Sequence, residues 1–169
     1  MTEKILVVDD EKSIREALNK VLRAENYEVL VAETGKDAVE RCGTGRIDLL
    51  LLDLNLPGKN GWATLDWLAK VNPLLPVIII TGRANQRELA EKSRADALME
   101  KPLDVPLLLQ TIRELLAEPM EIRAQRSSRR SSSFRFLSCD ERLFRQMLND
   151  RFTVPCPLTD RAWHLTEKD

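Results

Sequence analysis

Residues 49–52 are four consecutive leucines, and the aspartate Asp53 follows them directly. A run this apolar has no side chain suited to water, which is typical of a central strand covered on both faces, as in a parallel sheet. The next residues include Asn55, Pro57 and Gly58, which favour turns. The sequence therefore predicts a carboxylate at the C-terminal end of a buried strand, where open α/β sheets place their ligands.

Other short apolar segments alternate with stretches of helical periodicity. The predicted strands are 4–8, 27–31, 49–52, 76–80 and 97–99. The predicted helices are 13–25, 35–42, 61–71, 85–94 and a last one that begins near Pro106, a residue suited to the first turn. Five strands alternating with five helices predict an α/β fold, a doubly wound five-stranded parallel sheet with the flavodoxin-like order 2-1-3-4-5.

Polar residues stand where four of these strands end. Asp9 and Asp10 follow the first strand, Asp53 the third, Thr81 the fourth and Lys101 the fifth. In the predicted order the C-terminal ends of these four strands lie side by side, so the five residues should share one crevice. A single strand-end aspartate is usually only solvated. The convergence of five such residues indicates a functional site.

Three carboxylates in one crevice repel one another and raise one another's pKa unless a cation neutralises them. A hard divalent cation such as Mg2+ takes oxygen ligands and keeps several waters. Asp10, Asp53 and the backbone carbonyl of Asn55 are the expected direct ligands, and Asp9 is expected to bind directly or through water. The sequence therefore predicts a magnesium site.

Two further side chains would complete the chemistry around Asp53. Lys101 carries a charge that can reach an anion, and Thr81 carries a hydroxyl donor. A cation, a lysine and a hydroxyl around one carboxylate suit the neutralisation of a phosphoryl group during transfer. Asp53 would then be the nucleophile and form an aspartyl phosphate.

Four motifs carry a resemblance to a known family. They are VVDDE at 7–11, DLNLPGKNG at 53–61, TG at 81–82 and ADALMEKP at 95–102. Together they resemble the receiver domain of two-component response regulators, of the chemotaxis-receiver kind, over about two thirds of the chain.

The resemblance implies a phospho-acceptor without a classical enzymatic output, whose only chemistry is Mg2+-dependent self-phosphorylation and self-dephosphorylation. Asp53 would accept a phosphoryl group from a sensor histidine kinase or a phosphotransfer protein. Asp9 and Asp10 would bind Mg2+, while Thr81 and Lys101 would contact the phosphoryl group. The Lys101–Pro102 bond would be cis.

The resemblance also implies a homodimer contact through the face formed by the fourth helix, the fifth strand and the fifth helix. The chain departs from the family at Leu98, three residues before Lys101, where a Tyr or Phe is more common. The usual aromatic coupling to phosphorylation is therefore not expected. Arg83, two residues after Thr81, either alters the lifetime of the phosphate or is a solvated loop residue.

Residues 1–118 are expected to form the receiver domain, 119–138 an Arg/Ser-rich linker, and 139–169 a tail with one short amphipathic helix. Residues 123–136 show no hydrophobic period, so we expect them to be disordered. Residues 140–152 carry apolar side chains at helical spacing. Apart from that helix the tail is expected to be irregular.

Two alternatives assign a different class of function. The tail could be an effector that contacts nucleic acid through its arginines, but about 50 residues without a second apolar core are too few for a winged helix or a catalytic domain. This favours signalling by protein–protein interaction over nucleic-acid contact, which stays the alternative. A haloacid-dehalogenase-like enzyme would need a second acid two residues after its nucleophile, where this chain has Asn55.

Composition sets the remaining expectations. The apolar part of the N-terminus is too short for a signal peptide, and no run is long enough to span a membrane. We therefore expect a cytoplasmic protein without a membrane partner. Three widely and unevenly spaced cysteines are no disulfide framework.

Overall fold

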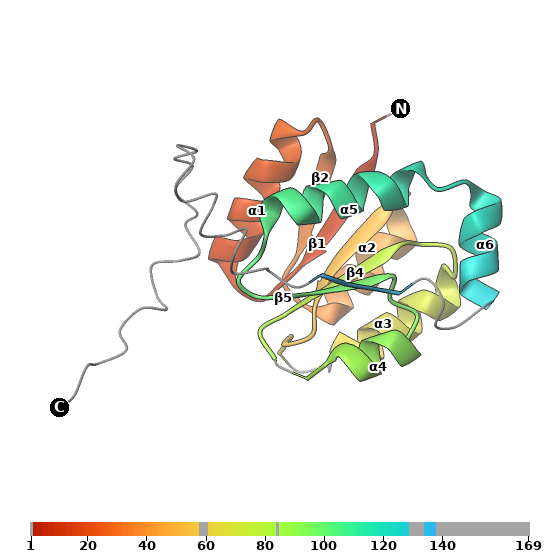
Figure 1. Cartoon of the computed structure of the whole chain (residues 1–169). Coiled ribbons are helices and arrows are strands. Elements are labelled where there is room, and N and C mark those ends of the chain that lie inside the picture. Colours follow the sequence, from red (N-terminus) through yellow and green to blue (C-terminus); the bar gives the residue numbers. More distant parts are fainter. Residues whose placement is uncertain (1, 58–60, 84, 129–133, 138–169) are drawn as a thin grey trace.

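A single sheet of parallel strands forms the centre of the molecule (Figure 1). The structure, a computed structural model of the 169-residue chain, describes residues 2–57, 61–83, 85–128 and 134–137. Within these residues the strand order is β2-β1-β3-β4-β5-β6. The order 2-1-3-4-5 expected from the sequence is confirmed, and β6 adds one more strand beyond β5.

The strands and helices alternate along the chain as far as α5. The strands are β1 (Lys4–Val8), β2 (Glu28–Ala32), β3 (Leu49–Asp53), β4 (Val77–Thr81), β5 (Ala97–Glu100) and β6 (Arg135–Leu137). The helices are α1 (Lys12–Ala24), α2 (Gly35–Thr44), α3 (Gly61–Val71), α4 (Arg87–Lys92), α5 (Val105–Ala117) and α6 (Met120–Ser128). Among the described residues, no helix combines the length and the apolar character that crossing a membrane requires.

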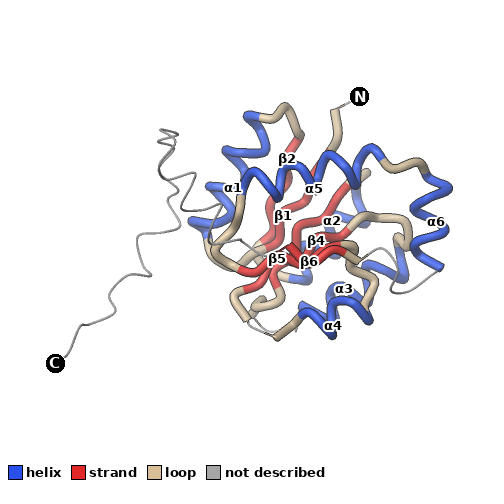
Figure 2. Tube along the Cα trace, in the orientation of Figure 1, coloured by secondary structure: helices blue, strands red, loops and turns tan. Residues whose placement is uncertain are grey.

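Helices cover both faces of the sheet, with α1 and α5 on one side and α3 and α4 on the other (Figure 2). The leucine run of β3 shows how one strand serves both layers. Leu49 and Leu51 pack with α1 and α5, whereas Leu50 and Leu52 pack with α2, α3 and α4. Because successive side chains of a strand point to opposite faces, a strand in this position needs apolar residues throughout.

Gly61, the first residue of α3, lets the chain turn tightly after β3. A Cβ atom at this position would lie 2.6 Å from the Cα of Leu54 and 2.8 Å from the backbone oxygen of Asp53. Only a residue without a side chain fits against that backbone. Gly61 therefore holds the start of α3 against the loop that carries Asp53.

The chain after α5 differs from the expectation of disorder for residues 123–136. Met120–Ser128 form α6, and Arg135–Leu137 form β6. Arg123 explains part of the difference, because its guanidinium donates to the carbonyls of Leu116 at 2.8 Å and Glu118 at 3.1 Å. Such carbonyls at a helix C-terminus have no partner within the helix, and a basic side chain can satisfy them.

The predicted helix at 140–152 lies outside the described residues. The divisions proposed at residues 118 and 138 also stay predictions. The prediction of disorder is wrong for the residues that α6 and β6 occupy.

We expect Gly61→Ala to lower the free energy of unfolding by about 1–3 kcal/mol, the usual cost of overpacking a filled site. Urea denaturation would measure the change. Gly43→Ala is the matched control, because no heavy atom lies within 4 Å of a Cβ at that exposed helical position. Alanine there should be neutral or stabilising. Equal effects of the two substitutions would contradict the packing argument.

Candidate functional site

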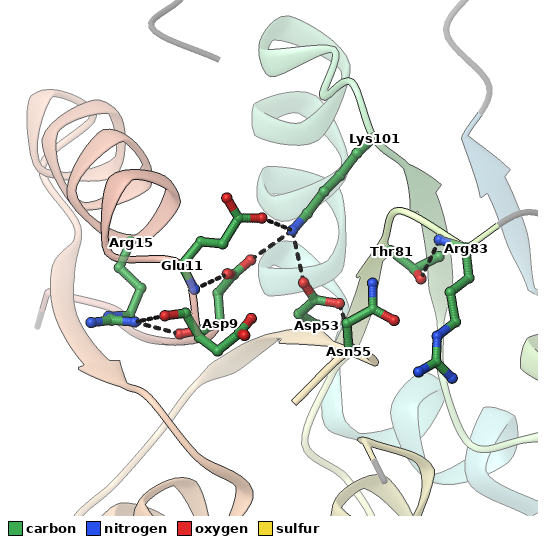
Figure 3. Close-up of polar contacts among 9 residues, drawn as sticks. Asp9, Glu11, Arg15, Asp53, Asn55, Thr81, Arg83 and Lys101 are labelled. Carbon is green, nitrogen blue, oxygen red and sulfur yellow. Dashed lines mark hydrogen bonds and ion pairs between the residues drawn. The ribbon is translucent and has the colours of Figure 1, made fainter. Parts of the chain in front are cut away.

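The ends of β1, β3 and β5 bring a lysine and two carboxylates into direct contact (Figure 3). The Lys101 ammonium donates to Asp53 Oδ2 at 2.7 Å and to Asp9 Oδ2 at 3.0 Å. Both carboxylates are 2% exposed. A buried charge requires a partner of opposite sign, and the Lys101 ammonium is that partner for both side chains.

The second oxygen of each buried carboxylate is held by the backbone. Asp9 Oδ1 accepts from the Glu11 amide at 2.8 Å, and Asp53 Oδ1 accepts from the Asn55 amide at 2.8 Å. In both cases the donor is two residues further on, the pattern of an Asx turn. The two loops thus orient their carboxylates in the same way, toward Lys101.

A third carboxylate completes an acidic cluster. Asp9, Asp10 and Asp53 each offer an oxygen, and these oxygens lie within 4.8 Å of one another. Asp10 is exposed, whereas the other two are buried. Two residues after Asp53, the side-chain oxygen Oδ1 of Asn55 is buried and has no hydrogen-bond partner among the described residues. An all-oxygen set of this kind fits a hard divalent cation such as Mg2+.

Burial is the largest single influence on the pKa values of Asp9 and Lys101. Burial raises the pKa of Asp9 to about 6, the Lys101 charge opposes this rise, and the Asp53 charge adds to it. For Lys101, burial lowers the pKa, but its hydrogen bonds and charge interactions with Asp53 and Asp9 outweigh burial and raise it. Lys101 is therefore a permanent cation at neutral pH.

Thr81 ends β4 and is fully buried. Its backbone oxygen accepts from the Lys101 amide at 2.8 Å, which links β4 to the residue that carries the ammonium. Its hydroxyl oxygen accepts from the Arg83 amide at 3.0 Å. The peptide bond between Lys101 and Pro102 is cis. The side chain of Arg83 is exposed and extends away from Lys101 (Figure 3).

Arg15 is a site residue that the sequence analysis missed. Its guanidinium is buried and donates to the backbone oxygens of Asp9 at 2.7 Å and Asp10 at 2.9 Å. It also pairs with the carboxylate of Glu33. One signal was present in the sequence: Arg15 follows Ile14 near the apolar face of α1, where a solvated arginine is unexpected.

Leu98 of β5, which stands where the family more commonly has Tyr or Phe, is fully buried. In the pairing between β5 and β6, Leu98 lies opposite Phe136. An aromatic side chain is thus next to Leu98, although it comes from a different strand.

The description "Response regulator receiver domain" is that of the family model that matches residues 5–113, which include all the site residues above. The chain belongs to this family. Its acidic pocket is typical of phospho-accepting response regulators.

Curated relatives are about one third identical to this receiver over the aligned residues. Transcriptional regulatory protein ZraR of Salmonella typhimurium is 34% identical over 132 residues, which are 77% of this chain and 30% of that protein. Sporulation initiation phosphotransferase F of Bacillus subtilis is 33% identical over 118 residues, 69% of this chain and 95% of that protein. The chain thus spans less than a third of ZraR but nearly all of the sporulation protein.

Solved receiver structures share the fold. A CheY-like receiver domain protein from Methanospirillum hungatei has a TM-score of 0.67 and 28% identity, covering 74% of this chain and 98% of that one. Response regulator TrrA from Thermotoga maritima, solved in complex with Mg2+-BeF, has a TM-score of 0.64 and 32% identity, covering 68% and 99%.

The raised pKa of Asp9 predicts how the free energy of unfolding depends on pH. Its value in the folded receiver lies above that of the unfolded chain, so the neutral carboxyl stabilises the fold at low pH, and this stability is lost as the pH rises through about 6. Without divalent cations, Asp9→Asn should therefore raise the free energy of unfolding near neutral pH by about 1–3 kcal/mol, at roughly 1.4 kcal/mol per pKa unit.

The measurement is urea unfolding in the presence of a chelator, at a pH well below and a pH well above the pKa of Asp9. The gain should shrink at the lower pH. Asp66→Asn, at an exposed position of α3, is the matched control. A gain of the same size at both pH values would contradict the assignment.

Proposed function

We propose that this receiver accepts a phosphoryl group on Asp53 from a sensor histidine kinase or a phosphotransfer protein, and that it signals through phosphorylation-dependent protein–protein interaction. One observation carries the proposal. Asp53 is a buried carboxylate in contact with a lysine, inside a cluster of three acidic side chains. That arrangement combines a nucleophile with groups that neutralise an incoming phosphoryl group.

In the proposed step, a carboxylate oxygen of Asp53 forms the new bond to phosphorus, while the bond from phosphorus to the donor breaks. Lys101, already 2.7 Å from Asp53, moves its hydrogen bond to a phosphoryl oxygen. Toward the Arg83 amide the Thr81 hydroxyl oxygen accepts, so the hydroxyl proton can be donated to a second phosphoryl oxygen.

Asp9, Asp10, Asp53 and the backbone carbonyl of Asn55 are the proposed ligands of Mg2+, whose charge would offset that of the phosphoryl oxygens. The TrrA structure supports this assignment, because that similar receiver was solved in complex with Mg2+-BeF. The Asx turns at Asp9 and Asp53 hold both carboxylates in place before any ligand arrives.

The output is proposed to be protein binding. Arg123 donates to backbone carbonyls of α5, and Arg135 pairs with Glu114. Two of the arginines on which a nucleic-acid contact would depend therefore already have partners within the fold. The proposed place of action is the cytoplasm. A homodimer through α4, β5 and α5 stays a prediction, and β6 lies beside β5 on that face.

Asp53→Asn should abolish labelling by acetyl phosphate in the presence of Mg2+, because it removes the attacking oxygen. Acid-labile phosphate on the intact protein is the readout. Asp66→Asn, which changes an exposed carboxylate outside the site, should be labelled like the unmodified protein. Undiminished labelling of the Asp53 variant would refute the proposal.

Mg2+ should raise the free energy of unfolding by about 2.7 kcal/mol when its concentration is a hundredfold above Kd. Because metal ligands must be deprotonated, the affinity should fall as the pH drops through about 6, the pKa of Asp9. Titrations followed by thermal melting test both points. Asp10→Ala should remove most of the shift, and an unmodified protein whose melting ignores Mg2+ would rule out the metal site.

A further inference from the structure

The outer edge of β5 is covered by a strand from the chain's own C-terminal region. β6 runs parallel to β5, with Ala97 opposite Arg135 and Met99 opposite Leu137. The Arg135 amide donates to the backbone oxygen of Asp96 at 3.0 Å. Figure 2 shows β6 beside β5, at the end of the sheet farthest from β2. Without β6, the last strand of the described sheet would be β5.

The side chains of β6 join both layers of the core. Leu137 is buried in the layer that includes α1 and α5. Phe134 and Phe136 pack against the layer on the other face. This alternation is that of a regular strand, so the segment is seated in the sheet and does not merely lie across its surface.

Polar contacts tie the same segment to the helices on either side of β5. Arg135 forms ion pairs with Glu114 of α5 and, at 3.6 Å, with Glu118, the residue that follows α5. The Arg87 guanidinium of α4 lies 5.0 Å from the centre of the Phe136 ring, a cation–π distance. Residues 134–137 therefore contact α4, β5 and α5 together.

An open strand edge presents unpaired N–H and C=O groups to any strand that can pair with it, and in this structure β6 is that strand. The elements on either side of the edge would favour a second copy of the chain, because α4 offers Arg87, α5 offers Glu114, and Glu118 follows α5 directly. A two-fold axis parallel to β5 would set Arg87 of one chain against Glu114 and Glu118 of the other, so the two copies would meet through the elements that flank the edge. In this structure β6 pairs with the edge of β5, Arg135 forms ion pairs with Glu114 and Glu118, and the ring of Phe136 contacts Arg87.

The contact is small enough to open. β6 pairs through three residues, its arginine lies in partly exposed ion pairs, and Phe134 and Phe136 are only partly buried. Short segments with few buried contacts open without unfolding the whole domain, and exposed ion pairs stabilise little.

We propose that residues 134–137 close the α4–β5–α5 surface against a second copy of this chain, so that self-association through that surface requires β6 to leave β5. The inference goes beyond phosphoryl transfer and does not depend on it. Its test uses no phosphoryl donor, so the two proposals can fail separately.

The experiment compares the full-length unmodified protein with Phe136→Ser/Leu137→Asp by sedimentation equilibrium. The double variant removes the ring and places a charge at a buried position, which should detach β6. Because both copies must be open to associate, a surface open in a fraction f of the chains has an apparent dimer Kd raised by about 1/f². Detaching β6 should thus lower the apparent Kd by at least about tenfold.

Ile122→Asp is the matched control, because it places the same charge at an exposed apolar position of α6, outside β6. It should associate like the unmodified protein. The proposal would be overturned if all three proteins associated equally, or if all three remained monomers.

Hydrogen exchange on the unmodified protein gives an independent readout that holds even if the double variant does not fold. The Arg135 amide should be protected in dilute monomer and should exchange faster as dimer forms at high concentration. A dimer in which this amide stays protected would overturn the proposal. So would a monomer in which the amide exchanges at the rate of an unfolded chain.

Discussion

The hydrogen bonds from Lys101 to Asp9 and Asp53 are the interaction on which the site depends. They join the ends of three strands, and they place one positive charge between two buried negative ones. Removing the Lys101 ammonium would leave two buried carboxylates without a counter-charge, which costs far more than a surface ion pair contributes. The position of Lys101 in turn depends on Thr81, whose carbonyl accepts from its amide, so β4 also helps to hold the centre together.

The sheet order and the meeting of Asp9, Asp53 and Lys101 could be predicted from the sequence, because both follow from patterns of a few residues each. The run Leu49–Leu52 needs apolar cover on both faces, and a parallel sheet provides it. Once the strand order is known, Asp9, Asp53 and Lys101 must meet at one edge. No feature of their own side chains was needed for that conclusion.

Features that depend on particular tertiary contacts could not be derived. Arg123 and Arg135 belong to a segment whose composition is typical of disorder, yet each finds acceptors that exist only after α5 has formed. Composition describes what a segment can do alone and is silent about partners distant in sequence. The same holds for the Thr81 hydroxyl, whose bond to the Arg83 amide is set by the geometry of the loop after β4.

Arg15 gives the acidic cluster a mechanical property. Since one guanidinium holds the carbonyls of both Asp9 and Asp10, neither residue can shift its backbone without the other. Through Glu33 the same group is attached to the loop after β2, a strand that contributes no carboxylate to the cluster. Arg15 therefore connects the backbone of both aspartates to α1, which carries it, and to the loop after β2. A ligand that displaced the acidic loop would therefore also disturb contacts at the β2 end of the sheet, on the side opposite β6.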